Sequence, residues 1–380
     1  MGIGYNLLSV RVYPRRIAAN WRLLAARSGN AWPVIKSDAY GHGLAGAARE
    51  LARAGATDFC VGTVGEAAQL LDAVPGVRAV SLLGPLDRAE CAEAAGRGVL
   101  CFCGRFEQLA MLDEAARDAG RPARVALKFD TGMARLGFTA SDLPEVLETL
   151  AACPDLTVEL AASHLATADE PATRDFVLGQ GRILAQVADS LRAAGRRVGI
   201  CLANSAALLA YPELHFDVQR PGIALYGANP LHGTSRDEPG LGLLPAMEVT
   251  APILSVHDLP AGASISYGRT FFAPRDMRVA VVAVGYADNY SRGLANKGFM
   301  NLAGTRAPIL GRVCMQMTAV DVTGLPCSAG DEIFLLGGPG PGTVTAEDLA
   351  GWWGTITYEI FCLLGQNPRQ EVLDTAPDLA

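Results

Sequence analysis

Short hydrophobic runs typical of β-strands alternate with amphipathic helical stretches from about residue 30 to residue 230. Runs rich in β-branched and aromatic residues predict strands, and the Ala-, Leu- and Arg-rich stretches between them predict helices. The predicted strands are residues 32–36, 58–62, 79–83, 99–103, 125–130, 158–164, 198–203 and 217–226. The predicted helices include residues 45–54, 65–72, 105–119 and 173–194.

Strict alternation of strand and helix implies right-handed crossovers and a parallel sheet. Eight such units over ~200–250 residues fit a closed barrel better than an open doubly wound sheet. No Gly-x-Gly-x-x-Gly follows the first strand directly, because the one at residues 41–46 begins only after four intervening residues, so the usual sign of a dinucleotide-binding fold is missing. We therefore predict an α/β protein whose first domain, residues 1–232, is a (β/α)8 TIM-type barrel.

The pattern changes after residue 229. Residues 230–245 are rich in Gly, Pro and Asp, which is typical of a connection between domains. Alternating or β-branched runs then recur, separated by Gly- and Pro-containing turns, at residues 248–256, 278–285, 307–313, 319–322 and 331–336. These runs predict a second, mostly β domain over residues 233–380.

The composition narrows the classes of partner. A net charge of −7 and a pI near 5.3 argue against nucleic acid or an anionic membrane surface. The apolar runs are too short to cross a bilayer, and no secretion signal opens the chain, so we expect a cytoplasmic protein. The nine cysteines include no Cys-x-x-Cys pair and lie mostly in apolar runs. This favours reduced thiols in the core over disulfides, and we expect no metal ion.

Residues 32–43 combine a short apolar run with a lysine and a polar, glycine-containing segment. Val34 and Ile35 favour an extended segment, and Gly41-His42-Gly43 ends regular structure. Lys36 therefore lies where a buried strand ends. Partial desolvation there lowers the pKa of the amine and makes it a usable nucleophile. The alternative is a lysine that extends its ammonium from the strand end into solvent.

Polar and charged residues also follow other predicted strands. They are residues 130–135, which end in Arg135, then His164, Asn204, Ser205 and residues 220–226, which begin with Arg220. Catalytic groups gather at the carboxyl ends of the strands in barrels of this kind. The sequence therefore predicts one site that contains Lys36 and these residues, rather than a scatter of solvated side chains.

A lysine at a strand end with anion donors nearby suits an enzyme that uses pyridoxal 5'-phosphate, because the amine bonds to the cofactor aldehyde and the phosphate needs anchoring. Barrels commonly bind phosphate with the loops after strands 7 and 8. Here those loops offer the Ser205 hydroxyl and the backbone N–H groups of Gly222 and Ile223. Tyr40 adds a phenol. The alternative for Ser205 is a cap for the helix that follows.

The segment VIKSDAYGHG at 34–43 closely resembles the cofactor-attachment signature of the alanine racemase family. Further segments resemble the same family in order along the chain: KFDTGMARLG at 128–137, SHLA at 163–166, NSAA at 204–207, RPGIALYG at 220–227, SYG at 266–268, GYAD at 285–288, GRVCM at 311–315 and TYEI at 357–360. Each match alone is moderately specific, and together they are highly specific.

The resemblance implies racemisation of alanine, L to D and back, which supplies D-alanine for peptidoglycan. It also implies a head-to-tail homodimer in which the β domain of one chain closes the barrel mouth of the other. Racemisation needs one base on each face of the substrate. The implied bases are Lys36 for the D-enantiomer and Tyr267 of the partner subunit for the L-enantiomer. A phenol has a pKa of about 10, so it needs help to act as a base at neutral pH, and the family pattern assigns that help to His164 held by Arg220. The alternative for Tyr267 is an interface tyrosine with a satisfied hydroxyl.

The resemblance assigns Arg220 a second task, opposite the pyridine nitrogen of the cofactor. Because arginine stays protonated, it keeps that nitrogen unprotonated and weakens the cofactor as an electron sink. The resemblance also places Arg135 near the phenolic oxygen and the substrate carboxylate, with Lys128 behind it and carbamylated in some members. It further implies that Asn204 and Tyr358 contact the cofactor and that Met315 and Tyr286 contact the substrate.

Four positions depart from the family pattern. Gln316 stands where the family usually has Asp, Asn289 and Ser291 stand where it favours Gly and Pro, and Ser37 replaces a usual Ala. These leave open a broader or serine-tolerant racemase. A related decarboxylase would be expected to present an acidic side chain to the pyridine nitrogen. Arg220 stands in that motif here, which argues against a decarboxylase. A cofactor carrier without turnover would lack the second domain and Tyr267.

Overall fold

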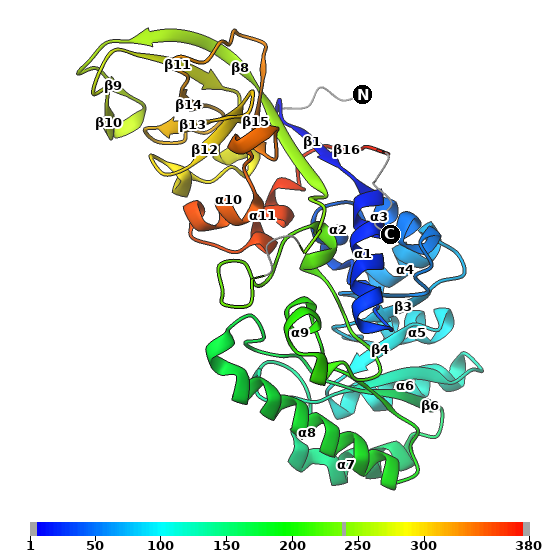
Figure 1. The fold of residues 1–380 in the computed structure, drawn as a ribbon. Coiled ribbons are helices and arrows are strands. Elements are labelled where there is room, and N and C mark those ends of the chain that lie inside the picture. Colours follow the sequence, from blue (N-terminus) through cyan, green and yellow to red (C-terminus); the bar gives the residue numbers. More distant parts are fainter. Residues whose placement is uncertain (1–5, 238–240, 375–380) are drawn as a thin grey trace. The chain divides into compact units, whose positions relative to one another are not determined.

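The computed structural model describes residues 6–237 and 241–374, and these residues form two compact units (Figure 1). The barrel unit contains residues 15–39 and 44–244, apart from 238–240. The β unit contains residues 6–14, 40–43 and 245–374. Each unit has its own sheet and its own buried apolar side chains.

Six parallel strands form the sheet of the barrel unit, in the order β2-β3-β4-β5-β6-β7. They are β2 (Asp58–Val61), β3 (Arg78–Ser81), β4 (Leu100–Cys103), β5 (Ala123–Lys128), β6 (Leu156–Ala162) and β7 (Gly199–Cys201). Isolated parallel bridges then close the ring through two further extended segments: Cys201 with Val218, Gln219 with Ala31, and Val34 with Cys60. The predicted (β/α)8 barrel is thereby confirmed.

The ring differs from the prediction where it closes. The sequence predicts full strands at residues 32–36 and 217–226, whereas the structure has single bridges there. The Val34 N–H still donates to the carbonyl of Pro221 (2.9 Å), so the two segments lie side by side. Pro221 has no N–H with which to continue a ladder. The second segment therefore ends there, and the chain turns into the 3-10 helix η4 (Ile223–Tyr226).

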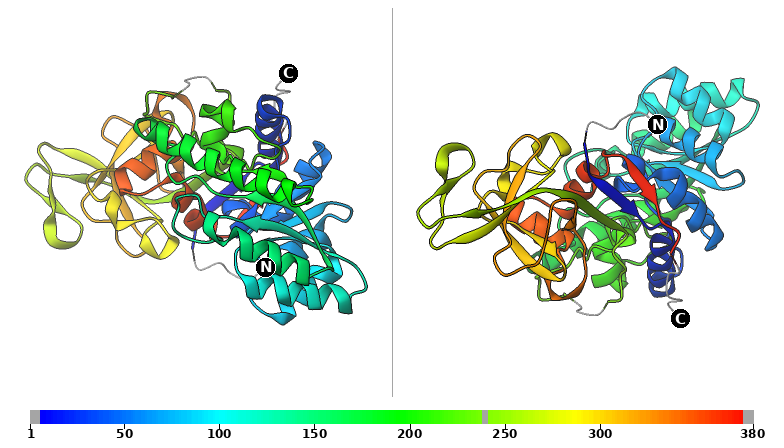
Figure 2. Two further views of the ribbon diagram at one scale, coloured as in Figure 1. Left: turned by 90° about the horizontal axis from the view of Figure 1, so that it is seen from below. Right: turned by 90° about the horizontal axis from the view of Figure 1, so that it is seen from above.

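Helices cover the outside of the ring and largely follow the predicted ranges. They are α1 (Pro14–Ser28), α3 (Leu44–Arg53), α4 (Val64–Ala73), α5 (Arg88–Arg97), α6 (Phe106–Asp118), α7 (Leu143–Ala152), α8 (Arg174–Ala193) and the short α9 (Ser205–Ala210). Consecutive helices from α3 to α7 pack against one another around the sheet (Figure 2). This packing buries the apolar face of each helix against the strands, which is the layer arrangement that crossover connections require.

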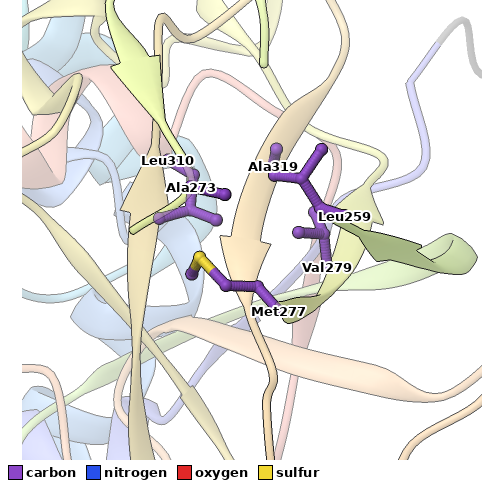
Figure 3. Close-up of a cluster of buried hydrophobic side chains, with 6 residues drawn as sticks. All are labelled: Leu259, Ala273, Met277, Val279, Leu310 and Ala319. Atoms are coloured by element: carbon purple, nitrogen blue, oxygen red, sulfur yellow. The ribbon is translucent and has the colours of Figure 1, made fainter. Parts of the chain in front are cut away.

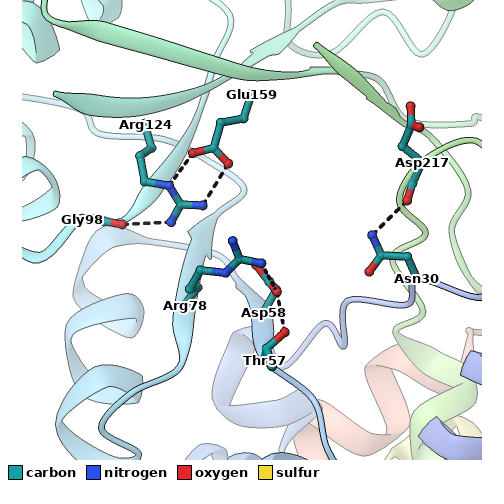
Figure 4. A network of polar contacts seen from close by, with 8 residues as sticks. All are labelled: Asn30, Thr57, Asp58, Arg78, Gly98, Arg124, Glu159 and Asp217. Carbon is teal, nitrogen blue, oxygen red and sulfur yellow. Dashed lines mark hydrogen bonds and ion pairs between the residues drawn. The ribbon is translucent and has the colours of Figure 1, made fainter. Parts of the chain in front are cut away.

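Polar contacts join neighbouring strands near their amino-terminal ends (Figure 4). Arg78, the first residue of β3, pairs with Asp58, the first residue of β2, at 2.6 Å. Arg124 of β5 donates two hydrogen bonds to Glu159 of β6, one of them 2.9 Å long. The amino-terminal end of a barrel contributes to stability, and the carboxyl-terminal end is left for chemistry.

The β unit contains one sheet of eight strands, in the order β11-β14-β13-β12-β15-β8-β1-β16. The strands are β1 (Ser9–Val12), β8 (Met247–Leu259), β11 (Met277–Val282), β12 (Phe299–Leu302), β13 (Thr305–Leu310), β14 (Thr318–Asp321), β15 (Glu332–Leu336) and β16 (Arg369–Glu371). The long strand β8 pairs with β1 and β15 along its first half and with β11 along its second half. Because β11 also pairs with β8, the six strands in the order β11-β14-β13-β12-β15-β8 form a closed ring. The predicted mostly β second domain is thereby confirmed.

A cluster of buried side chains anchors a small hairpin to this ring (Figure 3). The cluster consists of Leu259, Ala273, Met277, Val279, Leu310 and Ala319. The hairpin is formed by β9 (Ser264–Ile265) and β10 (Phe271–Phe272), and its residues Ile265 and Phe271 pack against the cluster. The loop between these two strands carries Tyr267 in the 3-10 turn η5 (Tyr267–Arg269). Apolar burial thus fixes the base of the loop that presents this tyrosine.

Two segments from the first part of the sequence belong to the β unit. Strand β1 pairs antiparallel with β8 and parallel with β16, so residues 6–14 lie in the second sheet. Residues 40–43 cluster with this unit as well, and both segments fall within the range that the sequence analysis assigns to the barrel. The domain boundary at residues 232 and 233 stays a prediction. The unit is completed by helices α10 (Ala346–Trp353) and α11 (Thr357–Leu364).

No disulfide joins the nine cysteines, all of which lie in the described ranges, and seven of them are buried. Desolvation raises the pKa of the Cys91 thiol to about 11 and that of Cys101 to about 12. These thiols are therefore inert core residues, as predicted. Among the helices of residues 6–237 and 241–374, none is both long and apolar enough to span a bilayer.

Candidate active site

The chain leaves the barrel wall at Lys36 in a left-handed helical turn. The short element α2 (Lys36–Tyr40) has φ values of 52° to 53° at Ser37, Asp38 and Ala39, and Tyr40 follows at 52°. Left-handed conformation costs about 1–2 kcal/mol for each non-glycine residue, so these four residues store on the order of 4–8 kcal/mol. Such strain persists only where the surroundings enforce it, and it is typical of functional sites. From the sequence, residues 37–43 are only a polar, glycine-containing segment, so this helical turn is not predicted, whereas the end of regular structure at Gly41-His42-Gly43 is.

Polar contacts within the barrel unit hold the first part of this turn. One carboxylate oxygen of Glu66 accepts from the Ser37 N–H (2.6 Å), and the other accepts from the Gly62 N–H (2.6 Å). The carboxylate of Asp38 accepts from the Leu44 N–H at 2.7 Å. Glu66 is not among the residues predicted from the sequence. Its signal is the spacing of Thr63 and Glu66, which form a capping box at the start of α4.

Arg220 lies at the centre of the polar residues predicted for the barrel mouth. Its side chain is buried, and one terminal nitrogen donates to the Cys201 sulfur at 2.6 Å. The other donates to the Ser163 carbonyl at 2.8 Å and lies 3.5 Å from Nδ1 of His164. Because arginine only donates, Nδ1 of His164 acts as the acceptor, and the proton of the neutral ring is on Nε2. Cys201 is a further residue that the sequence analysis misses, since a buried cysteine in a strand carries no distinguishing signal.

Crowding of positive groups sets the electrostatics of this mouth. Burial, together with the nearby guanidiniums of Arg220 and Arg135, lowers the pKa of the Lys128 amine to about 7 against the opposing effects of Cys201 and Asp130. Burial also lowers the pKa of His164 well below 6.5, and Arg220, Lys128, Arg135 and Lys36 add to this effect. His164 is therefore neutral at pH 7. The site has an excess of positive charge that an anion would relieve.

Arg135 belongs to a loop that is organised by a carboxylate. Oδ1 of Asp130 accepts from the N–H groups of Gly132 (2.8 Å) and Ala134 (3.1 Å). Burial raises the pKa of this carboxyl, but the backbone donors outweigh it and leave the pKa below its usual value. The loop thus keeps a charged cap at the end of β5. Arg135 itself is exposed.

The residues predicted to bind phosphate lie together. The Ser205 hydroxyl is buried and accepts from the N–H groups of Gly222 (2.8 Å) and Ala224 (3.3 Å), on either side of Ile223. Asn204 caps the helix α9 through the Ala207 N–H at 3.0 Å. The cap is therefore Asn204, and the alternative of Ser205 as the cap is wrong. Ser205 instead joins the two loops predicted to bind phosphate, where a hydroxyl and consecutive amides can bind an anion.

The remaining predicted residues belong to the β unit. The rings of Tyr40 and Tyr358 lie 5.8 Å apart, centroid to centroid, so two phenols predicted to contact the cofactor are neighbours. Tyr267 is 71% exposed, and Met315 is 57% exposed. The Tyr286 N–H donates to the Cys314 carbonyl at 3.0 Å, which places Tyr286 beside the loop that carries Met315.

A second contact brings Tyr267 to the same loop. The Ser266 hydroxyl donates to the Arg312 carbonyl at 2.6 Å, which fixes the start of η5 against residues 311–315. Tyr267, Tyr286 and Met315 therefore form one group of exposed side chains on adjoining loops of the β unit. Exposed aromatic and methionine side chains of this kind are typical of surfaces that a partner covers.

Models of the N-terminal and C-terminal domains of alanine racemase match residues 12–230 and 246–372. The chain belongs to the alanine racemase family. The alanine racemase of Nitratidesulfovibrio vulgaris (strain DSM 19637 / Miyazaki F) is 57% identical over 97% of this chain and 99% of its own length. That of Lawsonia intracellularis is 39% identical over 94% of this chain and 95% of its own length.

Solved structures of alanine racemases have the same fold. The enzyme from Streptomyces coelicolor A3(2) superposes with a TM-score of 0.89, at 33% identity over 97% of this chain and 98% of its own. The enzyme from Bartonella henselae, described with covalently bound pyridoxal phosphate, gives a TM-score of 0.84 at 27% identity over 96% of this chain and 99% of its own. The resemblance carried by the sequence motifs is thereby confirmed.

Proposed function

We propose that this protein racemises alanine with pyridoxal 5'-phosphate held on Lys36 at the mouth of the barrel. The observation that carries the proposal is the excess of positive charge that Arg220, Arg135 and Lys128 create around the neutral His164, in a chain of the alanine racemase family. The phosphate and phenolic oxygen of the cofactor are anionic, so they fit this charge. Ser205 and the adjoining amides fit the phosphate. When bound, the cofactor withdraws electrons from Cα of the amino acid and makes its proton acidic.

Two bases then exchange the proton at Cα. Nζ of Lys36 would take the Cα proton of D-alanine while Oη of Tyr267 delivers a proton to the opposite face, which gives L-alanine, and the two groups would exchange these roles in the reverse direction. The Arg220 guanidinium contacts Nδ1 of His164, so it leaves the Nε2–H on the other side of the ring to donate elsewhere. This N–H therefore suits donation to a phenolate oxygen, which lowers the pKa of the phenol. Because His164 is neutral, it stabilises the charge without competing for the proton.

Arg220 would oppose side reactions. Facing the pyridine nitrogen of a bound cofactor, its guanidinium, which stays protonated, would disfavour protonation of that nitrogen and so weaken the electron withdrawal that side reactions need. Its contacts with Cys201 and Ser163 hold it in one orientation. Arg135 would bind the phenolic oxygen and the substrate carboxylate, with the Met315 N–H and Tyr286 completing the carboxylate pocket. Asn204 and Tyr358 would support the cofactor.

Lys128 is suited to carbamylation. Because its pKa is lowered to about 7, neutral amine is present at pH 7, and a neutral amine attacks CO2 to form a carbamate and release a proton. The carbamate would pair with Arg135 and reduce the local positive charge. Carbamate formation therefore relieves the crowding that lowers the pKa of the amine.

The active form would be a head-to-tail homodimer. Exposed Tyr267, Tyr286 and Met315 of one β unit would close the barrel mouth of the other subunit, so that the L-face base is Tyr267 of the partner subunit. A cytoplasmic location and supply of D-alanine to peptidoglycan follow from the family role. Gln316, which replaces a usual aspartate, leaves room for substrates larger than alanine, and L-serine is the first to test.

The test is incubation of the purified protein with L-alanine and then L-serine, with chiral analysis and measurement of CO2. Inversion without CO2 supports the proposal, CO2 release supports a decarboxylase, and neither supports a carrier without turnover. Borohydride reduction and peptide mapping identify the lysine that bears the cofactor. The chain has three lysines, at 36, 128 and 297, so the assignment is unambiguous. Lys36→Ala should lose the visible absorbance of the bound cofactor, whereas Lys297→Ala should keep it.

A further inference from the structure

Residues 40–43, which end the left-handed turn, pack tightly against the end of α11 within the β unit. Gly41 has a φ of +80°, and a Cβ there would overlap the carbonyl oxygen of Phe361. A Cβ on Gly365 would overlap the carbonyl oxygen of Gly41. The two backbones therefore touch at a place where neither side admits a side chain.

Arg369 joins these two backbones. One of its terminal nitrogens donates to the Gly41 carbonyl at 2.9 Å and to the Gly365 carbonyl at 2.7 Å. Gly365 caps the carboxyl end of α11, where helix carbonyls have no partner within the helix and a cation is favourable. Two ring contacts flank the junction: Tyr40 with Tyr358 at 5.8 Å, and His42 with Phe361 at 5.0 Å.

We propose that Gly365 and Arg369 form a clasp, the α11 clasp, that holds the left-handed turn after Lys36 and so positions Tyr40 for the cofactor phosphate. This rests on the proposed function, because it takes Tyr40 as a phosphate ligand. Arg369 is a positioning residue, since its contacts reach the cofactor only through the turn.

The need for a clasp follows from the strain. Ser37, Asp38, Ala39 and Tyr40 all adopt a conformation that an unsupported chain would leave. Glu66 and Asp38 hold the first part of the turn. The end of the turn is held at Gly41, whose carbonyl receives the Arg369 guanidinium. Release of that carbonyl would let the backbone of Tyr40 relax to negative φ and turn its phenol away.

Gly365→Ala tests the clasp without a conformational penalty of its own, because Gly365 has a φ of −68°, which alanine also adopts. Gly351→Ala in α10 is the matched control, since a Cβ there meets nothing within 4 Å. Arg369→Ala removes both hydrogen bonds, and Arg369→Lys keeps a cation that can reach one carbonyl. The melting temperature shows whether each variant folds. If Gly365→Ala does not fold, Arg369→Ala still tests the clasp.

The readout is the affinity of the apoprotein for pyridoxal phosphate and for pyridoxal, which lacks the phosphate. Gly365→Ala and Arg369→Ala should bind pyridoxal phosphate about tenfold more weakly, as expected for the loss of a positioned hydrogen bond. Their affinity for pyridoxal should stay within about twofold of the parent, because the phosphate alone senses Tyr40. Arg369→Lys should recover part of the loss, and Gly351→Ala should match the parent.

Hydrogen exchange separates the clasp from the proposed function. Amides of residues 37–43 should exchange faster in Arg369→Ala than in the parent, whether or not cofactor is present. Unchanged amide exchange or unchanged affinity for pyridoxal phosphate in these variants would overturn the clasp. An equal loss of affinity for pyridoxal phosphate and for pyridoxal would also overturn it. A parent protein that binds no pyridoxal phosphate would overturn the proposed function, and the assignment of Tyr40 with it.

Discussion

Lys128 provides the sharpest test of the charge crowding at the barrel mouth. Lys128→Met removes the amine and keeps a side chain of similar length in the same buried space. The perturbation to apply is pH, because the amine of the folded protein has a pKa of about 7 and that of the unfolded chain has its ordinary value of 10.5. The folded protein therefore binds fewer protons than the unfolded chain between these two values, and stability rises with pH across that window.

The size of the effect follows from the two pKa values. Below pH 7 the folded protein carries the full cost of charging this amine, about 5 kcal/mol relative to the unfolded chain. This is an upper value, since the side chain retains some contact with solvent. As pH rises from 7 to 9, the cost falls, and the free energy of unfolding of the parent should increase by about 2 kcal/mol relative to Lys128→Met.

The assay is urea unfolding of parent and Lys128→Met apoproteins from pH 6 to pH 9, in buffer free of CO2. The apoprotein is used because cofactor binding would add a pH dependence of its own. Lys297→Met, at an exposed lysine of the β unit, is the control and should follow the parent at every pH. Added bicarbonate should stabilise the parent and leave Lys128→Met unchanged. Parallel curves for parent and Lys128→Met would refute the reasoning, since they would mean that Lys128 is neither desolvated nor crowded by cations.

Three further outcomes are expected. Tyr267→Phe should keep the visible cofactor absorbance and the exchange of the α-hydrogen of D-alanine with deuterated water. The same exchange in L-alanine should slow by on the order of 10²-fold or more. Equal exchange from both enantiomers would contradict the two-base assignment. Nitrogen NMR of His164 should show a neutral ring protonated at Nε2 at pH 6, because its pKa lies well below 6.5. The unfolded chain binds this proton first, so the free energy of unfolding should fall as pH drops from 6.5 toward the lowered pKa of the folded protein. A titration midpoint at 6.5 would exclude the effect of burial and Arg220. Gly137→Ala should lower the free energy of unfolding by about 2 kcal/mol or more in chemical denaturation, because a Cβ at φ +125° would lie 2.7 Å from the Asp130 nitrogen. Gly96→Ala is the control and should not lower it in this way, since a Cβ there meets nothing within 4 Å.

Much of the barrel was readable from local pattern. Buried strands such as β4 and helices such as α8 have periodicities that depend on near neighbours alone, and their ranges agree with the prediction to within about two residues. The ring closure was less readable, because single bridges at residues 31–34 and 218–219 depend on contacts far apart in the chain. Strand β1 has the same difficulty, since its partners β8 and β16 lie more than 200 residues away.

The sequence by itself determined the chemistry: the lysine at a strand end, the arginines, the histidine and the hydroxyl at the ends of later strands, and the order of the family motifs. These depend on residue type and spacing, which the chain carries directly. Only the tertiary structure decided the left-handed turn after Lys36, the burial that keeps His164 neutral, and the contact of Arg369 with Gly41. Each of these arises from groups far apart in sequence that pack together, and the free energy of such packing has no local signature.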